Sequence, residues 1–258
     1  MSTWVVVDSM TLTRRALAHW RANPGPLVFG MLFNAMLVLV FAYLFGGAIT
    51  VPGGQDYGSY LMPGMLGMSM LFGTGGSTEA IATDLRRGVV DRFRSMPMAS
   101  SAVLVGRAVA DLLLAVLTLA VLVGVGLLIG WRPEVGPGFA LALVLLLWFR
   151  FALTWVGVYL ALRMREGVVT VVQTVEFPVG FLSGAFIPTS TMPGWLGAIA
   201  DWNPLSSTVA ATRELTGNAA VAGSWPAEHP LLLAVVWPAV LLAVFFPLAA
   251  RAFARLGD

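Results

Sequence analysis

The chain has 258 residues, of which 58% are hydrophobic and only 11% are charged. Because a soluble domain normally carries about 25% charged residues, this composition argues against a water-soluble domain and favours a membrane protein. All 15 basic residues are arginine, and the absence of lysine excludes a GxxxxGK[ST] nucleotide loop. Cysteine is also absent, which excludes disulfides and thiolate metal sites. The net charge of only +2 does not indicate a nucleic-acid partner.

The first predicted element is an amphipathic helix at residues 9–22. Leu12, Ala16, Leu17 and Trp20 recur at helical spacing, and arginines cover much of the remaining face. A basic helix of this kind lies in the membrane interface. It is either a simple anchor or also a brace for a cytoplasmic partner.

Six apolar segments are long enough to cross a bilayer, which takes about 20 residues. They cover residues 27–46, 60–82, 103–130, 139–162, 168–188 and 231–250. Short cytoplasmic loops collect arginine, and twelve arginines fall on the side of the termini, against Arg132 and Arg213 on the other side. We therefore predict an all-α membrane protein that is one transmembrane domain over residues 1–258. Both termini are expected to be cytoplasmic, with no cleavable signal peptide and no soluble appendage.

A charged segment at residues 84–97 follows the second span. Arg87 and Asp91 are four residues apart and can pair along a helix, while Val89, Phe93 and Met96 form an apolar stripe on another face. Such a helix either docks into a groove on another protein or lies flat on anionic headgroups.

Asp111, Arg150 and Glu176 are ionisable side chains deep inside predicted spans. An intramembrane charge costs about 2.5–3.5 kcal/mol on insertion scales, so each needs a partner or a wet cavity. A very short turn joins the fourth and fifth spans, and counting along them places Arg150 and Glu176 at depths that match within about 5 Å. We therefore predict an Arg150–Glu176 pair, with Asp111 as the other candidate partner for Arg150. The pair either fixes helix register or serves a substrate or a proton.

Small residues are frequent in the second and fifth spans, including Gly64, Gly67, Gly180 and Gly184. They permit close helix packing, and a role in lining a pathway is the open alternative. The outer segment at 189–230 contains prolines that break helices and tryptophans suited to headgroup depth. It predicts a pair of short re-entrant or interfacial helices that cap the outer side.

Three stretches of the chain form an ordered pattern. They are RGVVDRFRSMP at 87–97 followed by GR at 106–107, FLSGAFIP at 181–188 with MPGW at 192–195, and NP at 203–204 followed by Arg213. In this order and with six spans, the sequence resembles the membrane subunits of ABC exporters of the type-2 permease family, particularly the daunorubicin-resistance-like bacterial members. The resemblance covers nearly the whole chain.

The resemblance implies an ABC type-2 exporter fold with an interfacial, a coupling and outer re-entrant helices. A separate cytoplasmic ATPase dimer would bind ATP and magnesium, and the permease would convert its closure into alternating access. Two permease chains, identical or closely related, would face each other in the membrane lipid. This chain would then hold no catalytic, cofactor-binding or metal site of its own.

The resemblance also implies roles for individual residues. The ATPase-coupling set comprises Asp84, Arg87, Gly88, Asp91, Arg92, Phe93, Arg94 and Pro97, with a second contact at Arg163, Arg165 and Glu166. The pathway or lid set comprises Gly64, Gly67, Gly180, Gly184, Phe186, Pro188, Pro193, Asn203 and Pro204.

We expect a permease subunit in a bacterial inner membrane that exports a hydrophobic drug, antibiotic or lipid-like compound. The alternative is a proton-coupled secondary transporter that uses Arg150, Glu176 and Asp111, although the internal repeats common in such folds are not visible. A passive scaffold is a third possibility, and substitution of Arg92 or Phe93 would discriminate it. An intramembrane hydrolase is not favoured, because the sequence has no paired aspartates, Ser–His arrangement or HExxH helix.

Overall fold

The computed structural model describes residues 18, 20–46, 56–87, 100–164, 166–218 and 223–255. Within these ranges the chain forms helices and no strand, which confirms the predicted all-α class. The predicted interfacial helix at 9–22 falls almost entirely outside them. In chain order the elements are α2 (Gly25–Phe45), α3 (Tyr57–Arg86), α5 (Ser100–Leu128), α6 (Pro137–Arg163), α7 (Val168–Phe181), the short 3-10 turn η1 (Thr189–Thr191), α8 (Gly194–Asp201), α9 (Pro204–Leu215), α10 (Trp225–Glu228) and α11 (Pro230–Ala254).

Prolines and a capping residue set where several helices begin. Pro137, Pro204 and Pro230 stand in the first turns of α6, α9 and α11, where a missing N–H is tolerated. Asn203 caps α9, because its side-chain oxygen accepts the backbone N–H two residues further on at 2.9 Å. Gly167 adopts φ 71° and allows the tight turn between α6 and α7.

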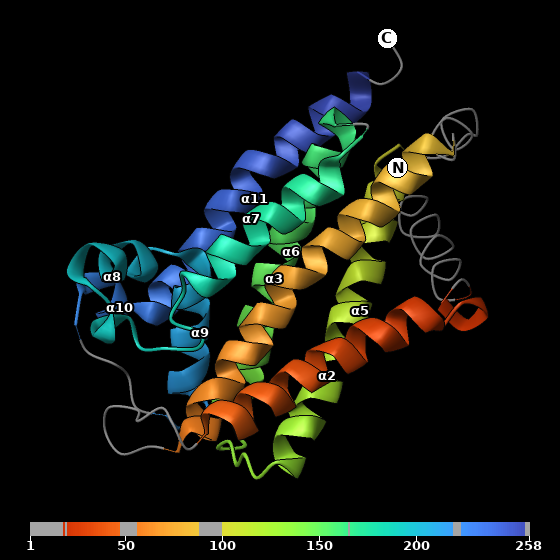
Figure 1. The fold of residues 1–258 in the computed structure, drawn as a ribbon. Coiled ribbons are helices and arrows are strands. Elements are labelled where there is room, and N and C mark those ends of the chain that lie inside the picture. The colour runs from red at the N-terminus through yellow and green to blue at the C-terminus, as the bar shows by residue number, and fades with distance from the viewer. Residues whose placement is uncertain are drawn as a thin grey trace.

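Helix α6 is the centre of the bundle and contacts α3, α5, α9 and α11 (Figure 1). Helix α3 packs between α6 and α7, whereas α6 and α7 make little direct contact although they are consecutive. Helix α2 crosses obliquely over α3 and α5, and the short helices α8, α9 and α10 gather at one end of the bundle. The order of packing is therefore not the order along the chain.

Four of the described helices are long and apolar enough to cross a membrane. They are α2 over Leu27–Leu44, α5 over Val105–Leu128, α6 and α11. Helix α3 has 30 residues, but its glycine, serine and threonine residues make it less apolar, and α7 has only 14 residues. Six predicted spans thus correspond to six helices, and the number that cross the membrane stays a prediction.

Helix α7 ends at Phe181, before the predicted end of the fifth span at 188. The chain turns there instead, and polar side chains at the start of α9 form hydrogen bonds with backbone groups that have no partner within α7. Asn203 Nδ2 donates to the carbonyls of Val179 and Leu182 at 2.7 and 3.0 Å, and Ser206 Oγ accepts from the Gly184 N–H at 3.0 Å. These bonds satisfy backbone groups that the non-helical turn leaves without helical partners.

Most of the described arginines lie at one end of the bundle. Ile81, Ala108, Leu162, Val168 and Phe253 pack into one cluster, which brings together the ends of α3, α6 and α11 and the starts of α5 and α7. We call this end the arginine end, because the helix ends that meet there carry Arg86, Arg87, Arg107, Arg163, Arg251 and Arg255. The opposite end holds Arg132 and Arg213.

Candidate functional site

A buried ion pair joins α5 to α6 in the middle of the bundle. Arg150 and Asp111 are 3% and 5% exposed, and Arg150 Nε and Nη2 donate to the two oxygens of Asp111 at 2.8 and 2.5 Å. Thr154 Oγ1 donates to the same carboxylate at 2.6 Å. Both oxygens of Asp111 are therefore engaged, and the two charges neutralise each other.

The same guanidinium also anchors α3. Arg150 Nη1 donates to the Met70 carbonyl at 2.9 Å, and Nη2 donates to the Gly73 carbonyl and to Ser77 Oγ at 2.7 and 3.0 Å. A Cβ at Gly73 would overlap the guanidinium, so the glycine makes this close approach possible. One side chain thus holds three helices together, and Arg is suited to it because it has five fixed donors.

The predicted Arg150–Glu176 pair is wrong, because the partner of Arg150 is Asp111. The prediction assumed that two spans joined by a short turn pack side by side. Helix α3 lies between α6 and α7 instead, so Arg150 and Glu176 reach it from different sides. Glu176 is 6% exposed, and its Oε1 accepts the backbone N–H of Gly75 at 2.8 Å.

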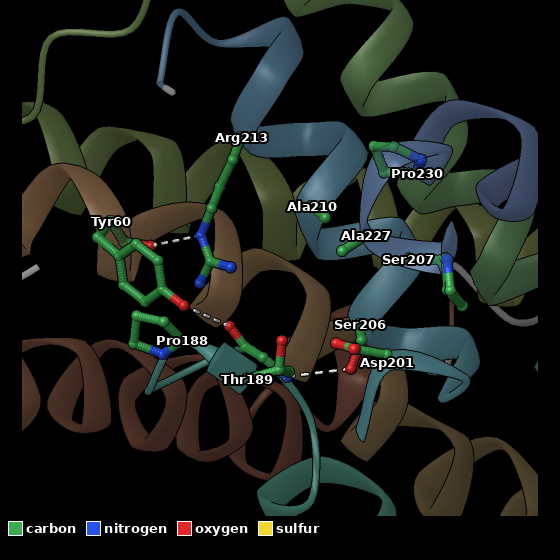
Figure 2. Close-up of a pocket in the computed structure, with 12 residues that line it drawn as sticks. Tyr60, Pro188, Thr189, Asp201, Ser206, Ser207, Ala210, Arg213, Ala227 and Pro230 are labelled. Carbon is green, nitrogen blue, oxygen red and sulfur yellow. Dashed lines mark hydrogen bonds between the residues drawn. The ribbon is translucent and has the colours of Figure 1, made fainter. Parts of the chain in front are cut away.

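A second polar cluster ties the outer segment to the start of α3 (Figure 2). Arg213 is 5% exposed, and its Cζ lies 3.6 Å from the centre of the Tyr60 ring. Its Nε donates to the Tyr60 carbonyl at 3.0 Å and its Nη2 to the Ala185 carbonyl at 2.8 Å. Tyr60 Oη donates in turn to the Gly184 carbonyl at 3.0 Å. The cation is stabilised by an aromatic face and by carbonyl dipoles.

A cavity of about 50 Å³ adjoins this cluster and is lined by Tyr60, Pro188, Asp201 and Arg213, among others (Figure 2). Pockets for drug-sized ligands have volumes of about 300–1,000 Å³. This cavity is therefore too small for such a substrate, and it belongs to the packing of the outer segment.

The predicted lid residues are distributed around the turn after α7. Pro188 and Pro193 precede η1 and α8, and Pro204 begins α9. Phe186 is buried and stacks on Phe41 of α2, with ring centres 4.5 Å apart. Helix α9 packs against α3, α6 and α11, and its re-entrant position in the membrane stays a prediction.

The predicted pathway glycines make close contacts inside the chain. A Cβ at Gly64 would overlap the Ala185 carbonyl, and one at Gly67 would press on Val209. A Cβ at Gly180 would lie 2.8 Å from the terminal carbon of Met68. These glycines allow α3 to approach α7, α9 and the turn between them, while a role in substrate passage stays a prediction.

The predicted coupling residues that the structure describes lie at the arginine end. Asp84 and Arg87 are at the end of α3, and Asp84 Oδ2 is 3.5 Å from Nη1 of Arg107 on α5. Arg163 and Glu166 flank the turn between α6 and α7 and are exposed. The rest of the set lies outside the described residues: Gly88, Asp91, Arg92, Phe93, Arg94, Pro97 and Arg165.

The sequence did not predict the contact between Tyr60 and Arg213, which are 153 positions apart. One signal was available, since Arg213 follows an uncharged run of α9 rich in serine and threonine. An arginine in such a setting needs carbonyl or aromatic partners. Among the described residues no cluster of His, Asp and Glu is arranged to hold a metal ion.

Comparison with known proteins places these features in a family. The model of the ABC-2 type transporter family matches residues 8–216. The chain is 35% identical over 250 residues to the daunorubicin resistance ABC transporter permease protein DrrB1 of Streptomyces coeruleorubidus. This alignment covers 95% of this chain and 86% of the relative. It is 26% identical over 252 residues to a Mycobacterium tuberculosis protein named for doxorubicin resistance, the ABC transporter permease DrrC, with 93% and 85% covered.

Proposed function

The chain belongs to the ABC-2 type transporter family, and we propose that it is the membrane-spanning permease subunit of an ATP-driven exporter. In this proposal it moves a hydrophobic drug, antibiotic or lipid-like compound out of the cell by alternating access. The observation that carries the proposal is the similarity, along almost the whole chain, to a daunorubicin resistance permease. A bundle of long apolar helices suits this role.

The energy would come from a separate ATPase dimer, which would bind ATP and magnesium. The chain contains no lysine for a phosphate-binding loop of its own. We propose that the arginine end faces the cytoplasm and receives the ATPase, with the segment 84–97 as the main contact and the turn at Arg163 and Glu166 as the smaller one. Both termini would then be cytoplasmic, and a second permease chain would complete the pathway.

The test is export by the full chain together with the ABC ATPase encoded nearest to it. Inside-out membrane vesicles should accumulate daunorubicin only when ATP is present. Phe93→Ala, in the proposed coupling segment, should reduce accumulation while ATP hydrolysis continues. Val135→Ala is a matched control, because Val135 is 85% exposed in the loop between α5 and α6 at the opposite end.

Two outcomes would contradict the proposal. Transport that continues without the ATPase and collapses with a protonophore would favour a proton-coupled secondary transporter. Full export by Phe93→Ala, with hydrolysis and export still coupled, would remove the segment 84–97 from the ATPase contact.

A further inference from the structure

Glu176 is a buried carboxyl group that takes no part in the described ion pairs. The described ion pairs are Arg150 with Asp111 and Arg107 with Asp84, and Arg150 is the cation that the sequence had assigned to Glu176. Hydrogen bonds from the described residues reach only one of its oxygens, Oε1, through the Gly75 N–H. The second oxygen, Oε2, accepts no hydrogen bond from the described residues. A buried carboxylate normally has a cationic partner, which makes this site a candidate for a cation from outside the chain.

Five phenylalanine rings form a continuous series beside this carboxylate, and we call it the aromatic ladder. Its rings, in spatial order, are Phe72, Phe177, Phe181, Phe186 and Phe41, with neighbouring ring centres 5.4, 6.1, 5.3 and 4.5 Å apart. Phe177 and Phe181 are nearly parallel, with 3° between their planes. The ladder connects α3 with α7 and, through the turn after α7, with α2.

The carboxylate and the ladder are close because the same turns of α3 and α7 carry both. Phe177 follows Glu176 in α7, and Phe72 precedes Gly75 by one turn of α3. Phe177 and Phe181 are 57% and 49% exposed, because α7 rests on α3 with its other face uncovered by the described residues (Figure 1). Open aromatic faces next to a carboxyl group without an ion-pair partner among the described residues suit one kind of ligand: a flat ring system with a protonated amine.

We propose that Glu176 and the exposed rings of the aromatic ladder form a binding site for planar aromatic compounds that carry a protonated amine. The ammonium group pairs with Glu176 Oε2, and the ring system stacks on Phe177 and Phe181. This inference rests on the proposed export function and adds to it the chemistry by which a substrate is selected. A neutral compound with the same rings gains only the stacking.

The test is a fluorescence titration of the purified full chain in lipid nanodiscs. The probes are daunorubicin, which carries a protonated amine on a planar ring system, and its N-acetyl derivative, which has the same rings without the charge. The wild-type chain should bind daunorubicin about tenfold more tightly, the loss expected when one charged contact is removed. This comparison needs no variant and therefore does not depend on the folding of one.

Glu176→Gln is the matched variant, because glutamine still accepts the Gly75 N–H and removes only the charge. It should weaken daunorubicin binding about tenfold and change binding of the N-acetyl derivative by less than about twofold. Phe181→Ala should weaken both probes. Val175→Ala, which shortens an exposed side chain without a ring on the same helix, should change neither.

Equal affinities of the wild-type chain for the two probes would overturn the inference, and so would equal losses for both probes in Glu176→Gln. A variant that changes the oligomeric mass but leaves both affinities unchanged would make this face a contact between permease copies. That result would also overturn the inference. The export proposal fails separately: binding with the predicted charge preference, but no ATP-dependent accumulation in vesicles, would refute export alone. ATP-dependent export without charge preference would refute the Glu176 site alone.

Discussion

Replacing Arg150 with methionine removes the cation at the centre of the bundle and leaves the Asp111 carboxylate buried without its ion-pair partner. The side chain of Arg150 contacts α3, α5 and α6 at once, through two bonds to Asp111 and three to α3 at 3.0 Å or less. Methionine fills much of the same volume, so the change tests the charge and its hydrogen bonds more than the packing.

Breaking a buried ion pair by removing one partner costs about 3–5 kcal/mol. In a protein of this length, 1 kcal/mol corresponds to about 2–4 °C in melting temperature. We therefore expect Arg150→Met to melt about 6–20 °C below the wild type. Arg150→Lys should fall between the two, because lysine keeps the charge but cannot form the planar fork to Asp111.

The measurement is thermal unfolding of the full chain in nanodiscs, followed by the fluorescence of its nine tryptophans. A double-mutant cycle gives the pairing directly. Arg150→Met combined with Asp111→Asn should recover part of the loss, with a coupling energy of about 1–3 kcal/mol. The same cycle with Glu176→Gln should give a smaller coupling energy than the cycle with Asp111→Asn.

Two results would refute the reasoning. One is a melting temperature of Arg150→Met within about 2 °C of the wild type, since the ion pair would then contribute less than about 1 kcal/mol. The other is a larger coupling energy for Arg150 with Glu176 than with Asp111, which would restore the pair predicted from the sequence.

Three further changes test the contacts of α3 and of the outer segment by the same melting measurement. Gly64→Ala should destabilise the chain by about 1–3 kcal/mol, because its Cβ overlaps backbone, whereas Gly76→Ala on the same helix meets open space and should be neutral or slightly stabilising. Asn203→Ala should cost about 1–2 kcal/mol, since it removes the cap of α9 and two bonds to carbonyls; Asn203→Asp keeps only the cap and should recover part of this. Tyr60→Phe should cost about 1 kcal/mol by leaving the Gly184 carbonyl without its hydroxyl donor. If one of these three variants melts at the wild-type temperature, that result contradicts the contact that the variant tests.

Long apolar runs made most of the fold predictable. The fourth predicted span, 139–162, is helix α6 at Pro137–Arg163, and the sixth, 231–250, is α11 at Pro230–Ala254. The family was also predicted, from three short motifs in order, and the family match confirms it. The end of the fifth span was less predictable, because α7 stops where side chains of α9, distant in sequence, can receive its backbone groups.

The sequence did not allow us to predict which helices are neighbours in the bundle. Counting residues gives the depth of Arg150, Asp111 and Glu176 along their helices, but it gives neither the rotation of each helix nor the identity of its neighbours. All three were recognised as needing partners, and the partner was assigned wrongly because α3 lies between α6 and α7. The contact of Arg213 with Tyr60 depends in the same way on the tertiary fold.

The position of the Arg150 anchor has a mechanical consequence for α3. A helix of 30 residues is about 45 Å long, and the bonds from Arg150 hold it between Met70 and Ser77, close to its midpoint. Arg213 also holds the Tyr60 end, so two polar anchors about 20 Å apart along α3 oppose both sliding and tilting of the helix.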